Sequence, residues 1–247
     1  MATDFNHVRG GDYEDFGPGE ILFTQGEAPD GMFVVLEGEV ILRVNGEIVE
    51  TVGPGGILGE MALVEGAPRM SLAETAGDVR VLRVDRRLFE SLVIQDADFA
   101  RLVLRTMSAR LRKMNIAAGG TGGEGATKAS DSTSRVLLAM KGHTAYPAGA
   151  TIFKEGDRGD RMYFVQSGSV ELRVGGKPVM TAEAGTFFGE MALIEEAPRS
   201  ASAHAATDCA LMPVDRARFE YLVRMTPDFV LEMMRTIAAR ARAMAKR

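Results

Sequence analysis

Two short segments of the chain have the residue types and the spacing to bind an anion. The first reads GEMAL at 59–63 and APR at 67–69, and the second repeats both at 189–193 and 197–199. An arginine guanidinium binds phosphate through two parallel hydrogen bonds, whereas a carboxylate accepts a hydrogen bond from a hydroxyl or an amide. The leading glycine lets a ligand approach the backbone, and the N–H groups of a first helical turn attract anions. Phosphate together with hydroxyl describes a nucleotide.

A structural interpretation of the same residues is also open. Glu60 with Arg69, and Glu190 with Arg199, could neutralise each other as buried ion pairs. For one Glu and one Arg at this spacing that alternative would be favoured, because short motifs often match by chance. Two matching copies in one chain favour the ligand-binding interpretation.

The two segments belong to a repeat that covers most of the chain at an offset of 130 residues (189 − 59). A repeat of this length is a domain rather than one unit of a solenoid, and we call its two occurrences the first and the second copy. We expect the first domain at 1–116 and the second at 135–247. The segment 117–134 is rich in glycine and serine, which predicts a flexible linker.

Short strands are the elements expected to position the two segments. Apolar runs at 32–36 and 40–44 predict strands, and the second copy repeats them. The dipeptides Asn45-Gly46 and Gly175-Gly176 supply the positive φ angles of tight hairpin turns. Many short strands separated by glycine indicate a double-sheet jelly roll, so the expected fold class is mainly β with flanking α: two β-rolls in tandem.

Helices are expected after each roll. Asp85 and Asp215 are favourable N-cap residues, and apolar side chains follow each of them at helical spacing. A longer helix is predicted at 98–114 and again at 227–244.

Composition is that of an ordinary globular protein, with 46% hydrophobic and 26% charged residues among 247. The net charge of −5 argues against a general nucleic-acid or anionic-membrane binder. The single cysteine, Cys209, cannot form an intrachain disulfide. We find no signal peptide and no stretch of transmembrane length, so we expect a cytoplasmic protein without a membrane span.

Catalysis is not expected. Metal-dependent enzymes built on rolls of this shape need clustered histidines and a carboxylate, and His7, His143 and His204 share no ligand spacing. Neither a Ser-His-Asp arrangement nor a kinase-type glycine loop is apparent. We therefore expect no catalytic residue and no bound metal.

The segments resemble the phosphate-binding cassette of the cyclic-nucleotide-binding domain family, which includes the catabolite activator protein, kinase regulatory subunits and cyclic-nucleotide-gated channels. The resemblance covers about 16–112 and 146–242 and implies a β-roll followed by helices. It implies that Glu190 accepts the ribose 2′-hydroxyl and that Arg199 pairs with the cyclic phosphate. The ligand-binding set implied for the second copy is Gly189, Glu190, Met191, Ala192, Arg199 and Ser200.

The first copy departs from the family pattern at one position. Its corresponding set is Gly59, Glu60, Met61, Ala62, Arg69 and Met70. The family often has Ser, Thr or Ala where Met70 stands, as the second copy does with Ser200. A thioether offers no hydroxyl and can crowd the phosphate unless it points away. Two alternatives therefore stay open, a functional first site and one that Met70 disables.

The resemblance also bears on the ligand. Family frequency favours cAMP, with cGMP as the alternative, and no residue here demands either. Family members cover the base with the last helix of the domain, so Met107 and Ile237 are candidates for an apolar lid; core packing is the other explanation for them. Ser108 could reach a base edge whereas Ala238 could not, so the two sites could differ in base preference.

A regulatory function is what the resemblance implies: ligand closes the helices over the roll, and a separate effector protein reads the change. The chain stops at Arg247, so we expect no helix-turn-helix and no direct DNA binding. Residues 1–16 contain Arg9 among four acids, so the basic inhibitory segment of kinase regulatory subunits is not expected. The long helices could form a homodimer. The alternative function is a degenerate pair of domains that binds protein and no nucleotide.

Overall fold

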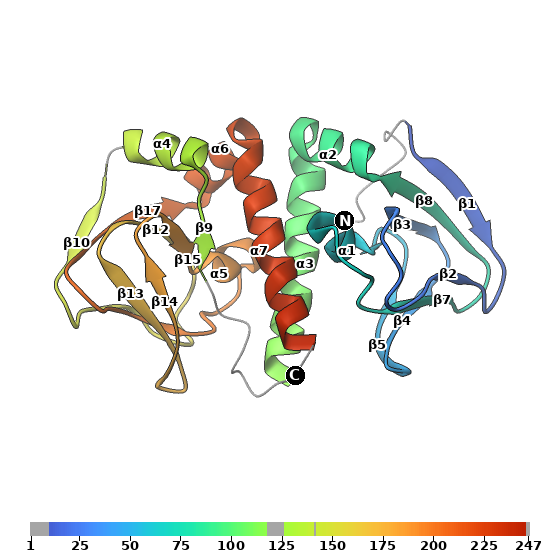
Figure 1. Cartoon of the computed structure of the whole chain (residues 1–247), viewed down its shortest axis with the longest axis horizontal. Helices are drawn as coiled ribbons and strands as arrows, with labels where there is room; N and C mark the ends of the chain where they lie inside the picture. The colour runs from blue at the N-terminus through green and yellow to red at the C-terminus, as the bar shows by residue number, and fades with distance from the viewer. Residues whose placement is uncertain (1–9, 118–125, 141, 246–247) are drawn as a thin grey trace. The chain divides into compact units, whose positions relative to one another are not determined.

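The computed structural model describes residues 10–117, 126–140 and 142–245 (Figure 1). By its internal contacts the chain divides between Asp96 and Ala97 into two compact units. Each unit contains two antiparallel sheets and flanking helices, which confirms the predicted fold class. The division falls before the long helix that the repeat assigns to the first copy, so that helix groups with the second unit.

The first unit consists of two four-stranded sheets, ordered β1-β8-β3-β6 and β2-β7-β4-β5. Its strands are β1 (Asp12–Phe16), β2 (Ile21–Phe23), β3 (Gly31–Glu37), β4 (Val40–Val44), β5 (Glu47–Val52), β6 (Ile57–Leu58), β7 (Leu72–Thr75) and β8 (Val79–Asp85). Its helices are α1 (Glu60–Glu65) and α2 (Arg86–Gln95). Side chains from both sheets, including Phe23 and Phe33, form one apolar core.

Local signals in the sequence explain several of these boundaries. The turn between β4 and β5 has positive φ angles at Asn45 (52°) and Gly46 (88°), as predicted. The Asp85 carboxylate accepts a hydrogen bond from the Leu88 N–H at 2.8 Å, which caps α2. Asp215 caps the equivalent helix of the second copy through the Arg218 N–H at 2.9 Å.

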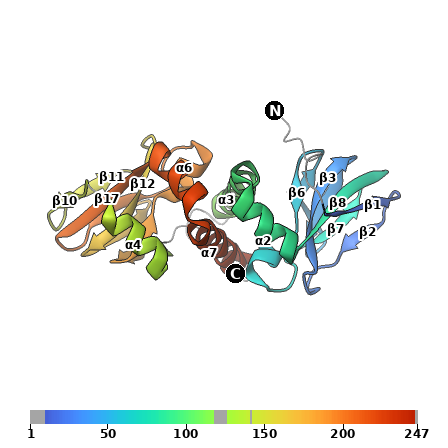
Figure 2. The same ribbon diagram turned by 90° about the horizontal axis from the view of Figure 1, so that it is seen from above.

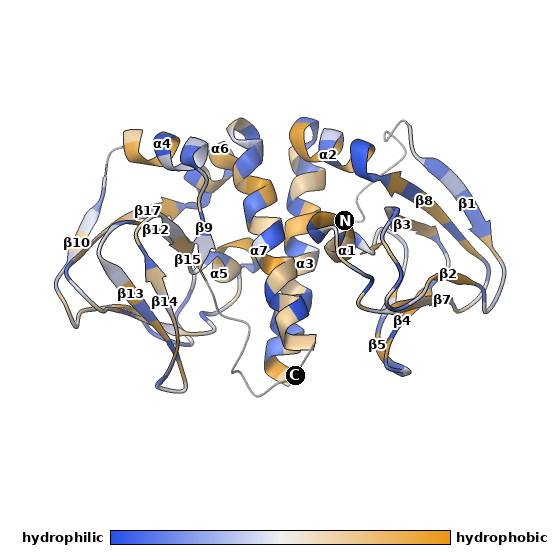
Figure 3. Ribbon diagram, viewed as in Figure 1, coloured by the Kyte–Doolittle hydropathy of each residue, from blue (hydrophilic) through white to orange (hydrophobic). Residues whose placement is uncertain are grey.

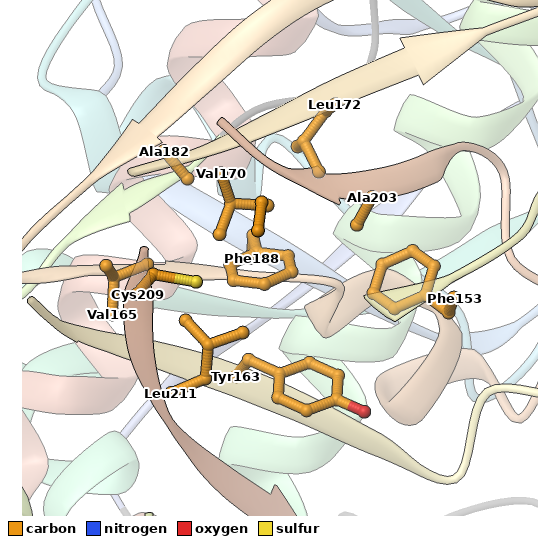
Figure 4. Close-up of a cluster of buried hydrophobic side chains, with 11 residues drawn as sticks. Phe153, Tyr163, Val165, Val170, Leu172, Ala182, Phe188, Ala203, Cys209 and Leu211 are labelled. Atoms are coloured by element: carbon orange, nitrogen blue, oxygen red, sulfur yellow. The ribbon is translucent and has the colours of Figure 1, made fainter. Parts of the chain in front are cut away.

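The second unit repeats the roll with sheets ordered β10-β17-β12-β15-β9 and β11-β16-β13-β14. Its strands are β9 (Thr127–Lys128), β10 (Thr144–Tyr146), β11 (Thr151–Phe153), β12 (Arg161–Ser167), β13 (Ser169–Val174), β14 (Lys177–Glu183), β15 (Thr186–Phe188), β16 (Ser202–Ala205) and β17 (Cys209–Asp215). Its helices are α3 (Ala97–Ala117), α4 (Asp131–Ala139), α5 (Glu190–Glu195), α6 (Arg216–Met225) and α7 (Pro227–Ala245). Phe153, Tyr163 and Phe188 stack in the core between the sheets (Figure 4).

Regular structure begins inside the segment that composition assigned to a linker. Strand β9 pairs with β15, and Ser130 caps α4 by accepting a hydrogen bond from the Thr133 N–H. Composition missed these elements because a two-residue strand takes its hydrogen bonds from an existing sheet edge and needs no core of its own. The glycine run at 119–125 lies outside the described residues.

Helices α3 and α7 lie side by side and run in the same direction (Figures 1 and 2). Hydrophobic and hydrophilic stretches alternate along both, as in amphipathic helices (Figure 3). Each buries the same face, related by the offset of 130: Phe99, Ala100, Val103, Leu104, Met107 and Leu111 in α3, and Phe229, Val230, Met233, Met234, Ile237 and Ala241 in α7. The apolar faces of both long helices are therefore covered within one chain. In the part of the chain that the structure describes, no helix combines the length and apolar character needed to cross a membrane.

Candidate functional site

Both cassette segments fold as a six-residue helix that starts at a glycine with left-handed backbone. Gly59 precedes α1 with φ 80°, and Gly189 precedes α5 with φ 74°. A Cβ at Gly189 would lie 2.9 Å from Arg199 Nη1, and one at Gly59 would collide with Arg69 Nη1. Glycine is therefore required by the backbone conformation and by the arginine that packs against it.

The second-copy arginine is buried, with only 5% of Arg199 exposed. Its Nη1 donates to the Gly189 carbonyl at 2.8 Å and its Nη2 to the Arg161 carbonyl at 2.6 Å. The guanidinium carbon lies 4.1 Å from the centroid of the Phe153 ring, and the buried Nε has no hydrogen-bond partner. Burial lowers the pKa of Arg199, but an arginine keeps its charge at neutral pH. A buried cation whose hydrogen bonds go to backbone carbonyls is suited to receive an anion.

The first-copy arginine has a different partner. Arg69 is 3% exposed, and its Nη1 donates to the Gly59 carbonyl at 3.0 Å, as in the second copy. Its Nη2, however, donates to the Asp30 carboxylate at 3.2 Å, and Asp30 also accepts from Arg83 at 2.7 Å. Burial lowers the pKa of Arg69, and Asp30 opposes that shift. An incoming phosphate would meet a carboxylate already bound to its arginine.

The surroundings of the equivalent aspartate differ in the second copy. Asp160 is the equivalent of Asp30, but Arg161 follows it where the first copy has Gly31. The Arg161 guanidinium binds the Asp160 carboxylate through two hydrogen bonds of 2.9 and 2.8 Å, and these bonds lower the pKa of that carboxyl. Arg161 thus occupies both oxygens of the Asp160 carboxylate, and the Arg199 Nη2 donates to the Arg161 carbonyl instead.

The second-copy glutamate is also buried, with 1% of Glu190 exposed. Its Oε1 accepts a hydrogen bond from Arg240 Nη1 of α7 at 2.6 Å, and the two side chains are 2% and 10% exposed. Glu190 therefore pairs with Arg240, and the structural alternative in which it pairs with Arg199 is wrong for this copy. The sequence pattern did not select Arg240. The repeat could have indicated it, because Arg110 holds the equivalent position in the first copy and the arginine is therefore present in both.

The remaining residues proposed for the second site come together around Arg199. A small cavity of about 10 Å³, room for about one water molecule, lies there; it is lined by Phe153, Leu172, Gly189, Met191, Ala192, Arg199, Ser200 and Ala201. In the first copy, Met61 and Ala62 are buried and Met70 is partly buried. The described residues contain no group of three or more His, Cys, Asp or Glu side chains placed to hold a metal ion.

The two residues considered for an apolar lid are buried, which agrees with core packing, the other explanation for them. Met107 and Ile237 are completely buried, as core residues of α3 and α7 would be. Ser108 is buried as well, and its hydroxyl donates to the Glu195 carboxylate. This hydrogen bond directs Ser108 to the cassette helix of the second copy. That Ser108 reads a base edge stays a prediction.

Fold and site together define a tandem β-roll protein in which a short glycine-led helix and a buried arginine recur in each copy. A family model described as the cyclic nucleotide-binding domain matches residues 13–96 and 143–225. These matches cover more than half of the chain, and the chain belongs to the cyclic nucleotide-binding domain family.

Curated relatives include regulatory subunits of cAMP-dependent protein kinase. The one from Aspergillus fumigatus is 33% identical over 224 residues, which are 85% of this chain and 51% of the relative. The one from Debaryomyces hansenii is 28% identical over 220 residues, 88% of this chain and 46% of the relative. The chain spans about half the length of these relatives. Among solved structures, the regulatory domain of Toxoplasma gondii PKA with cAMP is 27% identical and covers 89% of this chain and 84% of its own, with a TM-score of 0.35.

Proposed function

We propose that this chain is a cyclic nucleotide sensor that binds cAMP in its second roll, and in its first roll to a lesser degree, and that it regulates a separate effector protein. The observation that carries the proposal is the environment of Arg199, a buried cation whose hydrogen bonds go to backbone carbonyls. Burying a charge is costly without a partner of opposite sign, and a cyclic phosphate would supply one.

In the proposed complex, Arg199 pairs with the cyclic phosphate, and the backbone of Gly189, Met191 and Ala192 lines it. Glu190 accepts the ribose 2′-hydroxyl. Arg240 already ties Glu190 to α7, so a ligand hydroxyl would share that carboxylate with a residue of the long helix. Ligand contacts and the position of α7 would therefore be coupled, which is the property that a sensor needs.

The proposed role is regulatory rather than catalytic. Relatives named as kinase regulatory subunits support a protein kinase as the effector class. A homodimer through the long helices would need surfaces other than their apolar faces, since those faces are buried within the chain. The alternative function is an interaction module that binds no nucleotide.

Calorimetric titration of the full chain with cAMP and with cGMP tests the proposal. At a cAMP concentration of 100 times its Kd, the ligand should add about 2.7 kcal/mol to the free energy of unfolding. Neither heat of binding nor a thermal shift with either nucleotide would favour the interaction module. The Arg69→Ala variant decides between the two alternatives for the first site: the number of bound ligands falls if that site works and stays the same if Met70 disables it.

The first site should bind more tightly when Asp30 no longer competes for Arg69. In an Arg199→Ala background, where only the first site reports, we expect Asp30→Asn to raise the affinity for cAMP about fivefold. The gain is modest because Asp30 is 60% exposed, and ion pairs of exposed groups contribute at most about 1 kcal/mol. Calorimetry or competition with a fluorescent cAMP analogue measures the change.

The second copy provides the matched control. Asp160→Asn, in an Arg69→Ala background, should change the affinity of the second site by less than about twofold, because the Asp160 carboxylate is hydrogen-bonded to Arg161 and the Arg199 Nη2 donates to a carbonyl. Equal gains in the two copies, or weaker binding after Asp30→Asn, would contradict the role given to Asp30.

A further inference from the structure

A carboxylate at the end of the second cassette helix is held by a helix of the other copy. Glu195 is the last residue of α5, and its side chain is 10% exposed. Ser108 Oγ donates to Glu195 Oε1 at 2.5 Å, and Arg112 Nε donates to Glu195 Oε2 at 2.6 Å. Both donors lie on α3, which belongs to the first copy by the offset of 130 and to the second unit by its contacts.

The same arginine also reaches the residue before Arg199. Arg112 Nη1 donates to the Pro198 carbonyl at 3.2 Å. Arg112 therefore binds both ends of the loop 195–198, which connects α5 to the phosphate-binding arginine. These hydrogen bonds restrain the distance between the two ends of the loop. They therefore restrain the backbone position of Arg199 and the place of its guanidinium relative to Gly189.

The loop requires such support because its backbone is unfavourable. Glu196 adopts a left-handed conformation with φ 56°, where the first copy has Gly66 with φ 66°. A residue with a Cβ populates this region at a cost in free energy that glycine avoids. Contacts from outside the loop must compensate, and Arg112 makes two of them with a charge-assisted hydrogen bond to Glu195.

From this geometry we infer that Arg112, assisted by Ser108, is a positioning residue for the second cyclic nucleotide site, and that this site is completed by a side chain from the first copy. The inference rests on the proposed function. Arg112 acts through the loop and not through the ligand, since its hydrogen bonds go to Glu195 and Pro198. Without Arg112 the loop should be more mobile. Ligand binding would then have to order Arg199, and this entropic cost would lower the affinity.

The test uses the full chain in an Arg69→Ala background, so that cAMP titration reports the second site alone. Arg112→Ala should weaken cAMP binding about tenfold at unchanged stoichiometry, mainly through faster dissociation. Arg105→Ala is the matched control, because Arg105 is an exposed arginine on the same helix; its Kd should stay within about twofold of the parent. The charge-swapped pair Arg112→Glu with Glu195→Arg should recover part of the affinity, because it restores the ion pair but not the hydrogen bond to the Pro198 carbonyl; a loss of helix packing would not be rescued in this way.

The outcomes separate the inference from the proposed function. A parent that binds neither cAMP nor cGMP overturns the proposed function and the inference together. A parent that binds, with an Arg112→Ala variant of equal affinity, overturns the inference alone, even if that variant melts at a lower temperature. Should Arg112→Ala fail to fold by circular dichroism, Glu195→Gln decides: it keeps the side-chain shape and should weaken binding about threefold, and unchanged affinity would overturn the inference.

Discussion

Replacement of Arg199 by alanine is expected to lower the affinity of the second site for cAMP by about 100-fold or more. Truncating one partner of a buried charge pair costs about 2–5 kcal/mol in binding, and each 1.4 kcal/mol is a factor of ten in Kd. This range applies to Arg199 because the residue is 5% exposed and its guanidinium stacks on the Phe153 ring. Calorimetric titration in an Arg69→Ala background measures the effect without a contribution from the first site.

Two further variants show whether the loss is specific. Arg199→Lys retains the charge but not the planar pair of donors, so it should recover only part of the affinity. Arg173→Ala removes an arginine that is 44% exposed and paired with Glu171 on the roll surface, and it should leave the Kd unchanged. Wild-type affinity in Arg199→Ala would mean that the phosphate, if bound, lies elsewhere, and the proposed site would be abandoned.

Two kinds of feature could be predicted from the sequence: those that depend on a few neighbouring residues, and those that the repeat places. The offset of 130 residues places both cassettes, and the apolar run at 40–44 coincides with β4. The hairpin turn at Asn45-Gly46 and the cap at Asp85 depend only on the preferences of one or two residues. Because a turn or a cap of this kind depends on so few residues, the local sequence pattern is sufficient to predict it.

The partners of the charged residues could not be predicted, because they depend on contacts between distant parts of the chain. Arg240 meets Glu190 across 50 residues, and Arg112 meets Glu195 across 83. A basic residue near a helix C-terminus is usually solvated, and no local pattern separates that case from a buried partner. The contrast between Asp30 and Asp160 likewise becomes meaningful only when the fold brings Arg69 or Arg161 within reach.

A second large effect is expected at the ion pair between the cassette and the long helix. We expect Arg240→Ala to lower the free energy of unfolding of the second unit by about 3–5 kcal/mol, because it leaves the Glu190 carboxylate buried without its cationic partner. A cost of this size applies to buried ion pairs, and this pair is buried: the Glu190 and Arg240 side chains are 2% and 10% exposed, and their N–O distance is 2.6 Å. Urea unfolding followed by circular dichroism gives the value, and Arg235→Ala, at an exposed position of the same helix, serves as the control.

A double-mutant cycle separates the pair from general packing at this point. If the cost of Arg240→Ala comes from an unpaired carboxylate, then the cost should fall when the carboxylate is absent as well, because two neutral side chains leave no buried charge. Glu190→Gln combined with Arg240→Met should therefore be less destabilised than the sum of its single variants. Additive effects, or an Arg240→Ala variant within about 0.5 kcal/mol of the wild type, would show that this ion pair does not hold α7 to the cassette.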